Sequence, residues 1–148
     1  MVNGMISEVL ATKDGTLWSI SPATTVFEAI QVMAERNVGA VLVMDGLLLA
    51  GVLTERDYTR KVALKGKSSK DTPVREIVNA SPLTVTPQHT VEHCMRLMTE
   101  NRVRHLPVIE DGRVVGIVSI GDLVNWIIRV QNAAITQLEG YISGHYAV

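Results

Sequence analysis

The sequence has little of what several classes of protein depend on. Its 148 residues include one cysteine, Cys94, so a disulfide within the chain is excluded and a reducing compartment is the expected setting. The aromatic residues are one Phe, two Trp and three Tyr, too few for a surface that stacks the bases of single-stranded nucleic acid. With 14 Lys and Arg against 15 Asp and Glu, the net charge of −1 favours neither nucleic acid nor an anionic membrane as a partner.

Long apolar runs are absent as well. No segment approaches the roughly 20 apolar residues that a membrane-spanning helix needs. The first residues, MVNGMISEVL, lack a basic region followed by an apolar run, so they do not predict a secretory signal. Hydrophobic residues still make up 47% of the chain. We therefore expect a cytoplasmic protein with ample material for a core and without a membrane partner.

What the sequence does contain is an internal repeat. The segments GVLTERD at 51–57 and GIVSIGD at 116–122 share a glycine, two aliphatic residues, a hydroxyl residue and a final aspartate. Their glycines stand 65 residues apart, and the same offset aligns residues 20–58 with 85–123 without a gap. Identical pairs in this alignment include Pro22 and Pro87, Thr25 and Thr90, Val26 and Val91, Met33 and Met98, and Asp57 and Asp122. Two copies of one structural unit are predicted.

Each copy has the pattern of strand, helix, strand, strand and helix. A short strand ends near a proline, and apolar residues then recur at helical spacing after a Thr that can cap the helix. Two apolar runs separated by Asp-Gly, at 45–46 and again at 111–112, predict hairpins. A further helix follows each Asp of the motif, and short helical segments at 7–10 and 75–78 precede the two copies.

A unit of about 60 residues buries too little surface alone. We therefore expect an α/β (α+β) fold in which two β-α-β-β-α repeats pack through their sheets about a pseudo-twofold axis. The expected boundaries are 5–66 for the first repeat, 67–130 for the second and 131–148 for a C-terminal helical tail. The clefts between such repeats are where a small ligand is expected.

Both copies carry a hydroxyl residue three positions before an acid, Thr54 before Asp57 and Ser119 before Asp122. This spacing at the beginning of a helix is typical of a capping box, in which the two side chains bond backbone N–H groups. The same place suits a ligand, because a helix N-terminus attracts phosphate and a carboxylate can accept hydrogen bonds from ribose hydroxyls. The two interpretations are compatible, and the sequence leaves both open.

The paired motifs resemble a tandem of cystathionine-β-synthase (CBS) domains, also called a Bateman module, from about residue 5 to about residue 130. The resemblance is to stand-alone CBS-pair proteins. It implies an adenine-nucleotide ligand between the repeats, with AMP as the first candidate and ADP, ATP, NAD or S-adenosylmethionine as others. It further implies a non-catalytic regulatory module that acts through an unknown partner protein. A ligand-free interaction scaffold is the alternative.

The resemblance also implies roles for individual residues. Those that would bind the ribose are Thr54, Asp57, Ser119 and Asp122. Those that would face the phosphates are Arg56, Arg104, His105 and Gly121. Those that would contact the adenine or line the cleft are Val52 and Ile117, with Ser21 and Thr86 reaching each site from the opposite repeat.

The two sites are not expected to be equal. The first repeat has Gly39 and Ala40 where the second has Arg104 and His105. The residue before the aspartate is arginine in the first repeat and glycine in the second. The sites should therefore differ in ligand or affinity, or one should be empty. An AMP-like ligand is expected first at the site of Asp122.

Three other kinds of site are considered from the sequence: a phosphate cover, a metal site and a catalytic site. The basic segment 60–75 is either a solvated connection or a cover in which Lys67, Ser68 and Ser69 fold over phosphates, and it lacks a base-reading motif. The residues that invite a zinc hypothesis match no standard ligand spacing, so no metal is predicted: His89, His93, Cys94 and His105. Neither a nucleophile elbow nor a Gly-rich phosphate loop is present, so no catalytic residue is predicted and an enzyme is not expected.

The C-terminal segment 122–142 predicts one long helix with an apolar stripe. The stripe consists of Leu123, Ile127, Val130, Ala134 and Leu138. It is longer than one repeat needs, which predicts packing against a second chain in a homodimer. Folding of the helix back onto its own repeat is the alternative.

Overall fold

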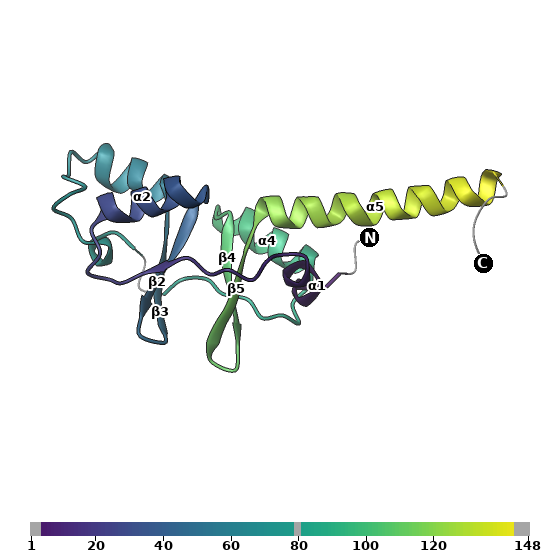
Figure 1. Cartoon of the computed structure of the whole chain (residues 1–148), viewed down its shortest axis with the longest axis horizontal. Helices are drawn as coiled ribbons and strands as arrows, with labels where there is room; N and C mark the ends of the chain where they lie inside the picture. Colours follow the sequence, from purple (N-terminus) through teal and green to yellow (C-terminus); the bar gives the residue numbers. More distant parts are fainter. Residues whose placement is uncertain (1–3, 79–80, 144–148) are drawn as a thin grey trace.

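The computed structural model describes residues 4–78 and 81–143. The first repeat contains β1 (Ser19–Ile20), α2 (Val26–Arg36), β2 (Ala40–Asp45), β3 (Leu48–Thr54) and α3 (Glu55–Tyr58), which continues as the π-helical turn η1 (Thr59–Ala63). The second contains α4 (Val91–Asn101), β4 (His105–Glu110), β5 (Arg113–Ser119) and α5 (Ile120–Ser143). The short helix α1 (Ile6–Ala11) and the 3-10 turn η2 (Val74–Glu76) precede them. The predicted α/β class with two repeats and a C-terminal helix is confirmed (Figure 1).

Each repeat is built around an antiparallel hairpin. In the first, β2 lies between β1, which is parallel to it, and β3, which is antiparallel. In the second, β4 and β5 form the hairpin, and the strand expected before Pro87 is reduced to a single parallel bridge between Val85 and Val108. The hairpin turns are Gly46-Leu47 and Asp111-Gly112, where Gly46, Asp111 and Gly112 have positive φ. The turns match at the 65-residue offset although the two Asp-Gly pairs are shifted by one residue.

The helices after the first strand begin and end alike. The side chain of Thr25 accepts a hydrogen bond from the amide of Glu28 at 3.2 Å, and that of Thr90 accepts one from His93 at 3.0 Å. Each helix ends at a left-handed residue, Asn37 in the first repeat and its counterpart in the second. The predicted caps are confirmed, and the side chain of a threonine satisfies one of the free amides at each beginning.

The repeats exchange their short leading helices. The core of the second repeat contains the fully buried Ile6 and Val9 of α1, while the core of the first contains Val74 and Ile77, from η2 and its end. Backbone bonds hold both exchanges: the amide of Ile6 donates to His89 and the amide of Val74 donates to Thr24. The expected boundaries 5–66 and 67–130 thus divide the chain in sequence only, because the core of each repeat includes side chains from the other segment.

Helix α5 extends far beyond the second repeat, as Figure 1 shows. Its first turn is buried at Leu123, whereas Ile128, Ile135 and Leu138 are 46%, 52% and 61% exposed. The helix does not fold back onto its own repeat. Within the described ranges, none of the helices has the length and apolar character needed to cross a membrane.

The exchanged helix generates a stability prediction. Replacing Ile6 by Ala should lower the free energy of unfolding by about 2–5 kcal/mol, because a fully buried aliphatic side chain is lost from the core of the second repeat. Urea unfolding followed by circular dichroism measures the loss. Leu48→Ala is the control, since Leu48 is 74% exposed and its replacement should change the stability by less than about 0.5 kcal/mol. Equal stabilities of the two variants would contradict a structural role for α1.

Candidate functional site

The strand-to-helix junction of the first repeat is closed by reciprocal hydrogen bonds. The carboxylate of Asp57 accepts from the amide of Thr54 at 3.0 Å, and the hydroxyl of Thr54 accepts from the amide of Asp57 at 3.1 Å. One carboxylate oxygen, Oδ2, takes the bonds from Thr54, and the other, Oδ1, lies 3.6 Å from the ammonium of Lys61. The capping box holds the acid at the beginning of α3 with Oδ1 outside the box.

The second repeat has the same junction. The amide of Ser119 donates to Oδ2 of Asp122 at 2.8 Å, and the amide of Asp122 donates to the hydroxyl of Ser119 at 3.1 Å. The capping-box interpretation is therefore confirmed in both copies. The ligand interpretation does not conflict with it, because a cap uses only part of the acceptor capacity of a carboxylate.

A pocket of about 910 Å³ opens at the first junction. From the first repeat it is lined by Gly39, Val52, Thr54, Glu55, Arg56, Asp57, Thr59, Arg60 and Lys61. From the connection and the second repeat it is lined by Pro82, Leu83, Asn101, Arg102, Val103, Arg104, His105 and Pro107. It is thus a cleft between the repeats, in the size range of small-molecule sites.

The pocket is strongly cationic. Its lining includes the cationic side chains Arg56, Arg60, Lys61, Arg102 and Arg104, against the carboxylates of Glu55 and Asp57. Arg56 reaches across the cleft and donates to the carbonyl oxygen of Arg102 at 3.4 Å. This carbonyl is at the left-handed end of α4, so the guanidinium links the two repeats at the rim. The excess of positive charge suits an anion.

His105 lies where the two junctions approach each other. It begins β4 opposite Ser119 of β5, and its ring lines the pocket of the first repeat. Burial lowers the pKa of His105 below the usual histidine value, and Lys13 and Arg104 add to the effect, against the opposite influence of Asp122 and Glu55. The ring is therefore held in its neutral form over a wider range of pH than a free histidine.

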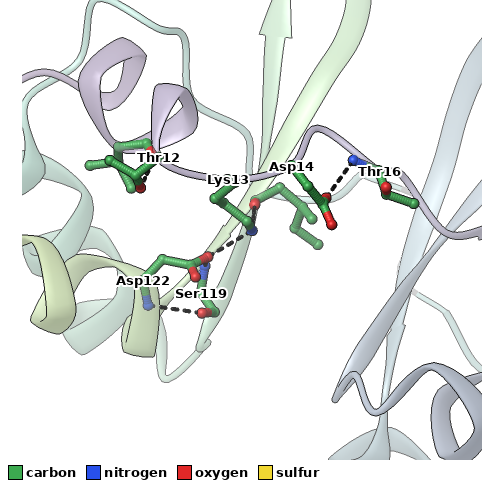
Figure 2. Close-up of polar contacts among 8 residues, drawn as sticks. Thr12, Lys13, Asp14, Thr16, Ser119 and Asp122 are labelled. Atoms are coloured by element: carbon green, nitrogen blue, oxygen red, sulfur yellow. Dashed lines mark hydrogen bonds and ion pairs between the residues drawn. The ribbon is translucent and has the colours of Figure 1, made fainter.

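At the second junction the carboxylate is already paired (Figure 2). The ammonium of Lys13 donates to Oδ2 of Asp122 at 2.8 Å and to the carbonyl oxygen of Ile117 at 2.6 Å. Burial alone would raise the pKa of Asp122, but the hydrogen bonds from Lys13 and Ser119 outweigh it and hold the pKa below the usual carboxyl range. The acid is thus ionised and neutralised from within the chain.

The structure groups the predicted site residues differently from the expectation. The pocket at the first junction brings together Val52, Thr54, Arg56, Asp57, Arg104 and His105. Arg104 and His105, which the sequence analysis placed with Asp122, line this pocket, because it lies between β3–α3 of one repeat and the beginning of β4 of the other; their role at either acid stays a prediction. The residues that do not line this pocket are Ile117, Ser119, Gly121 and Asp122, at the second junction, and Ser21 and Thr86.

Ser21 and Thr86 take part in local turns. The hydroxyl of Ser21 lies 3.1 Å from that of Thr24, and the amide of Thr86 donates to the ring of His89 at 2.9 Å. Both residues are exposed. Their predicted approach to the clefts stays a prediction.

Two lysines at the junctions were missed as site residues. Lys61 stands four positions after Asp57, a spacing that pairs side chains on one helix face and could have identified it. Lys13 lies 104 residues from Ile117, has an apolar counterpart, Val78, in the repeat, and carries no sequence signal for its position.

The remaining candidates lie outside the pocket. Ser69 accepts a hydrogen bond from the amide of Phe27 at the beginning of α2, so the segment around Lys67 and Ser68 does not cover the cleft. Cys94 is buried, and burial raises the pKa of its thiol to about 11. In residues 4–78 and 81–143, no three or more His, Cys, Asp or Glu side chains gather in a way that could hold a metal ion.

Proteins of known sequence and structure are similar to this chain. The CBS-domain family matches the chain twice, at residues 5–64 and 74–129. The CBS domain-containing protein CBSX3, mitochondrial, of Arabidopsis thaliana is 41% identical over 150 residues, which cover 95% of this chain and 73% of the relative. A solved protein with CBS domains from Burkholderia ambifaria MC40-6 superposes with a TM-score of 0.82 at 44% identity, covering 84% of this chain and 94% of that one.

A more distant structure carries ligands. The CBS domain pair of protein MJ0100, solved in complex with 5′-methylthioadenosine and S-adenosyl-L-methionine, superposes with a TM-score of 0.72 at 20% identity, covering 84% of this chain and 96% of that one. At this identity the likeness shows a shared fold.

The environment of His105 predicts a pH dependence of stability. Because the folded chain disfavours the charged ring, the unfolded chain binds more protons once the pH falls through about 6.5. The free energy of unfolding should therefore decrease from that pH down toward the lowered pKa, and His105→Gln should remove this part of the decrease. Urea unfolding of both proteins between about pH 7.5 and 5.5 measures it. Parallel stability curves would contradict the burial of the ring.

Proposed function

The chain belongs to the CBS-domain family, and on that premise we propose that it is a regulatory module that binds an adenine nucleotide and acts through a partner protein without catalysis. The observation that carries the proposal is the cationic cleft beside Thr54 and Asp57. It combines an acid fixed at a helix beginning with arginines from both repeats. A nucleotide presents the complementary groups, a diol and phosphates.

The residues of the cleft suggest how the ligand would lie. Oδ2 of Asp57 is used by the capping box, so Oδ1 is the acceptor for ribose hydroxyls, with Lys61 3.6 Å away. Val52, on the strand that leads into the junction, offers an apolar contact for the adenine. The phosphates would then extend toward Arg56 and Arg104, where the arginine forks suit phosphate oxygens.

The charge of the cleft ranks the candidate ligands. A set of four arginines and one lysine favours several phosphate charges, so ATP and ADP rank above AMP, which was the first candidate from the sequence. S-adenosylmethionine carries a sulfonium cation and ranks last at this cleft, although the MJ0100 pair was solved with it. NAD carries two phosphate charges and ranks between ATP and S-adenosylmethionine in expected affinity. The proposed site is thus at Asp57 and not at Asp122.

A ligand-free scaffold is the second candidate. It is favoured by one observation: the capping boxes alone account for the conservation of hydroxyl and acid between the two repeats. In that function the apolar face of α5 would be the surface that binds the partner protein. Ligand binding distinguishes the two candidates.

The proposal includes a homodimer in the cytoplasm. The support for the homodimer is α5, which exposes apolar side chains beyond the second repeat in the part of the chain that the structure describes, including Ile128, Ile135 and Leu138. The support for the compartment is the single, buried cysteine, which suits a reducing environment. The Arabidopsis relative is named as mitochondrial, so the family does not determine the compartment.

Thermal denaturation with added nucleotide tests the ligand. At about 100 times its Kd, ATP should stabilise the chain by about 2.7 kcal/mol, and the order of affinity should be ATP and ADP, then AMP, then S-adenosylmethionine. Asp57→Asn should abolish the shift, because the amide can keep the cap but loses the charged acceptor for the ribose. Asp71→Asn, at an exposed residue outside the pocket, is the control and should keep the shift. The absence of a shift with any of these ligands would favour the scaffold.

Sedimentation of helix variants tests the homodimer. The wild-type chain of 16.2 kDa should sediment at twice this mass, and Ile135→Asp should give the monomer, because it places a charge in the apolar face. Thr136→Asp adds the same charge on the polar side of α5 and should leave the dimer intact. A wild-type monomer, or equal behaviour of the two variants, would contradict this interface.

A further inference from the structure

The second junction lacks most of the charge of the first. At the 65-residue offset each cation of the first cleft has a neutral counterpart at the second: Gly121 for Arg56, Asn125 for Arg60, Trp126 for Lys61, Asn37 for Arg102 and Gly39 for Arg104. One exchange runs the other way, since Arg36 replaces Asn101, but its guanidinium stacks on Trp18 at 4.2 Å. The second junction is therefore poorly equipped for phosphates.

The cation that remains at the second junction is Lys13. Its ammonium bonds the carboxylate of Asp122 at 2.8 Å and the carbonyl oxygen of Ile117 at 2.6 Å. These groups correspond to the carboxylate of Asp57 and the backbone of Val52, both of which line the open pocket of the first junction. Lys13 thus bridges the acid and the strand at the second junction, through Oδ2 of Asp122, which the capping box also uses, and through the carbonyl oxygen of Ile117 (Figure 2).

The fold holds Lys13 in this place. The residue follows α1, whose Ile6 and Val9 are fully buried in the core of the second repeat. The amide of Lys13 donates a hydrogen bond to the carbonyl oxygen of Leu10 at 3.0 Å, and the hydroxyl of Thr12 donates one to the carbonyl oxygen of Val9 at 2.7 Å. These bonds fix the backbone at the end of α1, next to Lys13. Five residues after Lys13, the backbone is fixed again, because the carbonyl oxygen of Trp18 accepts a hydrogen bond from the amide of Leu42. The short link between these anchors keeps the ammonium near Asp122.

The first junction has no cation at the position that corresponds to Lys13. The counterpart of Lys13 is Val78, which cannot bond a carboxylate. Lys61 lies 3.6 Å from Asp57 but spends a hydrogen bond on the carbonyl oxygen of Ile77 at 2.9 Å. Both acids thus have a lysine nearby, but the ammonium lies 2.8 Å from the carboxylate of Asp122 and 3.6 Å from that of Asp57, which lines the pocket.

We propose that the ammonium of Lys13 occupies the second junction, excludes nucleotides from Asp122 and limits the chain to one nucleotide, at the cleft of Asp57. Lys13 is thus the residue that determines how many ligands the pair of repeats accepts. The stoichiometry rests on the proposed function, whereas the occupancy of Asp122 by Lys13 does not.

Isothermal titration tests the stoichiometry. ATP should bind the wild-type chain with one molecule per chain, and Asp57→Asn should remove all of it. Two ATP per chain, or one ATP remaining in the Asp57→Asn variant, would overturn the inference. Binding of no ATP to the wild type would overturn the proposed function but not the inference, which the next variant then decides.

Removal of the lysine tests the occupancy. Lys13→Met keeps the length of the side chain without the ammonium and should create a site for adenosine, an uncharged probe that suits a cleft without phosphate-binding cations. The gain should be one adenosine per chain relative to the wild type, and it should vanish in the double variant Lys13→Met/Asp122→Asn. Lys65→Met, at an exposed lysine outside both junctions, should leave adenosine binding as in the wild type.

Two outcomes would overturn the occupancy. One is a folded Lys13→Met chain with the adenosine stoichiometry of the wild type, and the other is the same gain in Lys65→Met. Lys13→Gln serves as the second variant if the Met variant does not fold, since it also lacks the ammonium and stays polar at a partly exposed position. It should show the same gain.

Discussion

The exchange of short helices between the repeats is the constraint on which the rest of the structure depends. Neither repeat buries enough apolar surface from its own strands and helices, so α1 completes the core of the second repeat and η2 completes that of the first. Because the chain must leave α1 and return to β1, it has to cross the second junction. The crossing brings Lys13 onto Asp122, and the connection from η2 brings Pro82 and Leu83 to the wall of the first cleft.

A nearly symmetric backbone here carries an asymmetric distribution of charge. The two capping boxes agree in their hydrogen bonds to within a few tenths of an ångström, since both solve the same problem of free amides at a helix beginning. Side chains that point into the clefts are under no such structural demand. The cleft at the first junction is therefore lined by arginines from both repeats, while the second junction has neutral residues at the corresponding positions and a lysine bound to its acid.

The long helix α5 shows a second departure from the repeat. Its counterpart in the first repeat, α3 with η1, ends after a few turns at Ala63, whereas α5 continues to Ser143. The part near the repeat is held by Leu123 in the core, whereas Ile128, Ile135 and Leu138 in the part beyond it are exposed. Apolar side chains exposed along a helix are typical of an interaction surface, which is the reason for the proposed homodimer.

Much of the fold could be read from the sequence, because the repeat, the helix caps at Thr25 and Thr90 and the hairpin turns depend on local patterns. The acids at the junctions were identified for the same reason: a hydroxyl residue and an acid three positions apart interact within one turn of helix. Tertiary structure alone decided that α1 packs in the other repeat, that Arg104 and Thr54 line one pocket, and that Lys13 bonds Asp122. These contacts join residues far apart in the chain, and their partners are selected by the packing of whole elements, which leaves no periodic or local trace in the sequence.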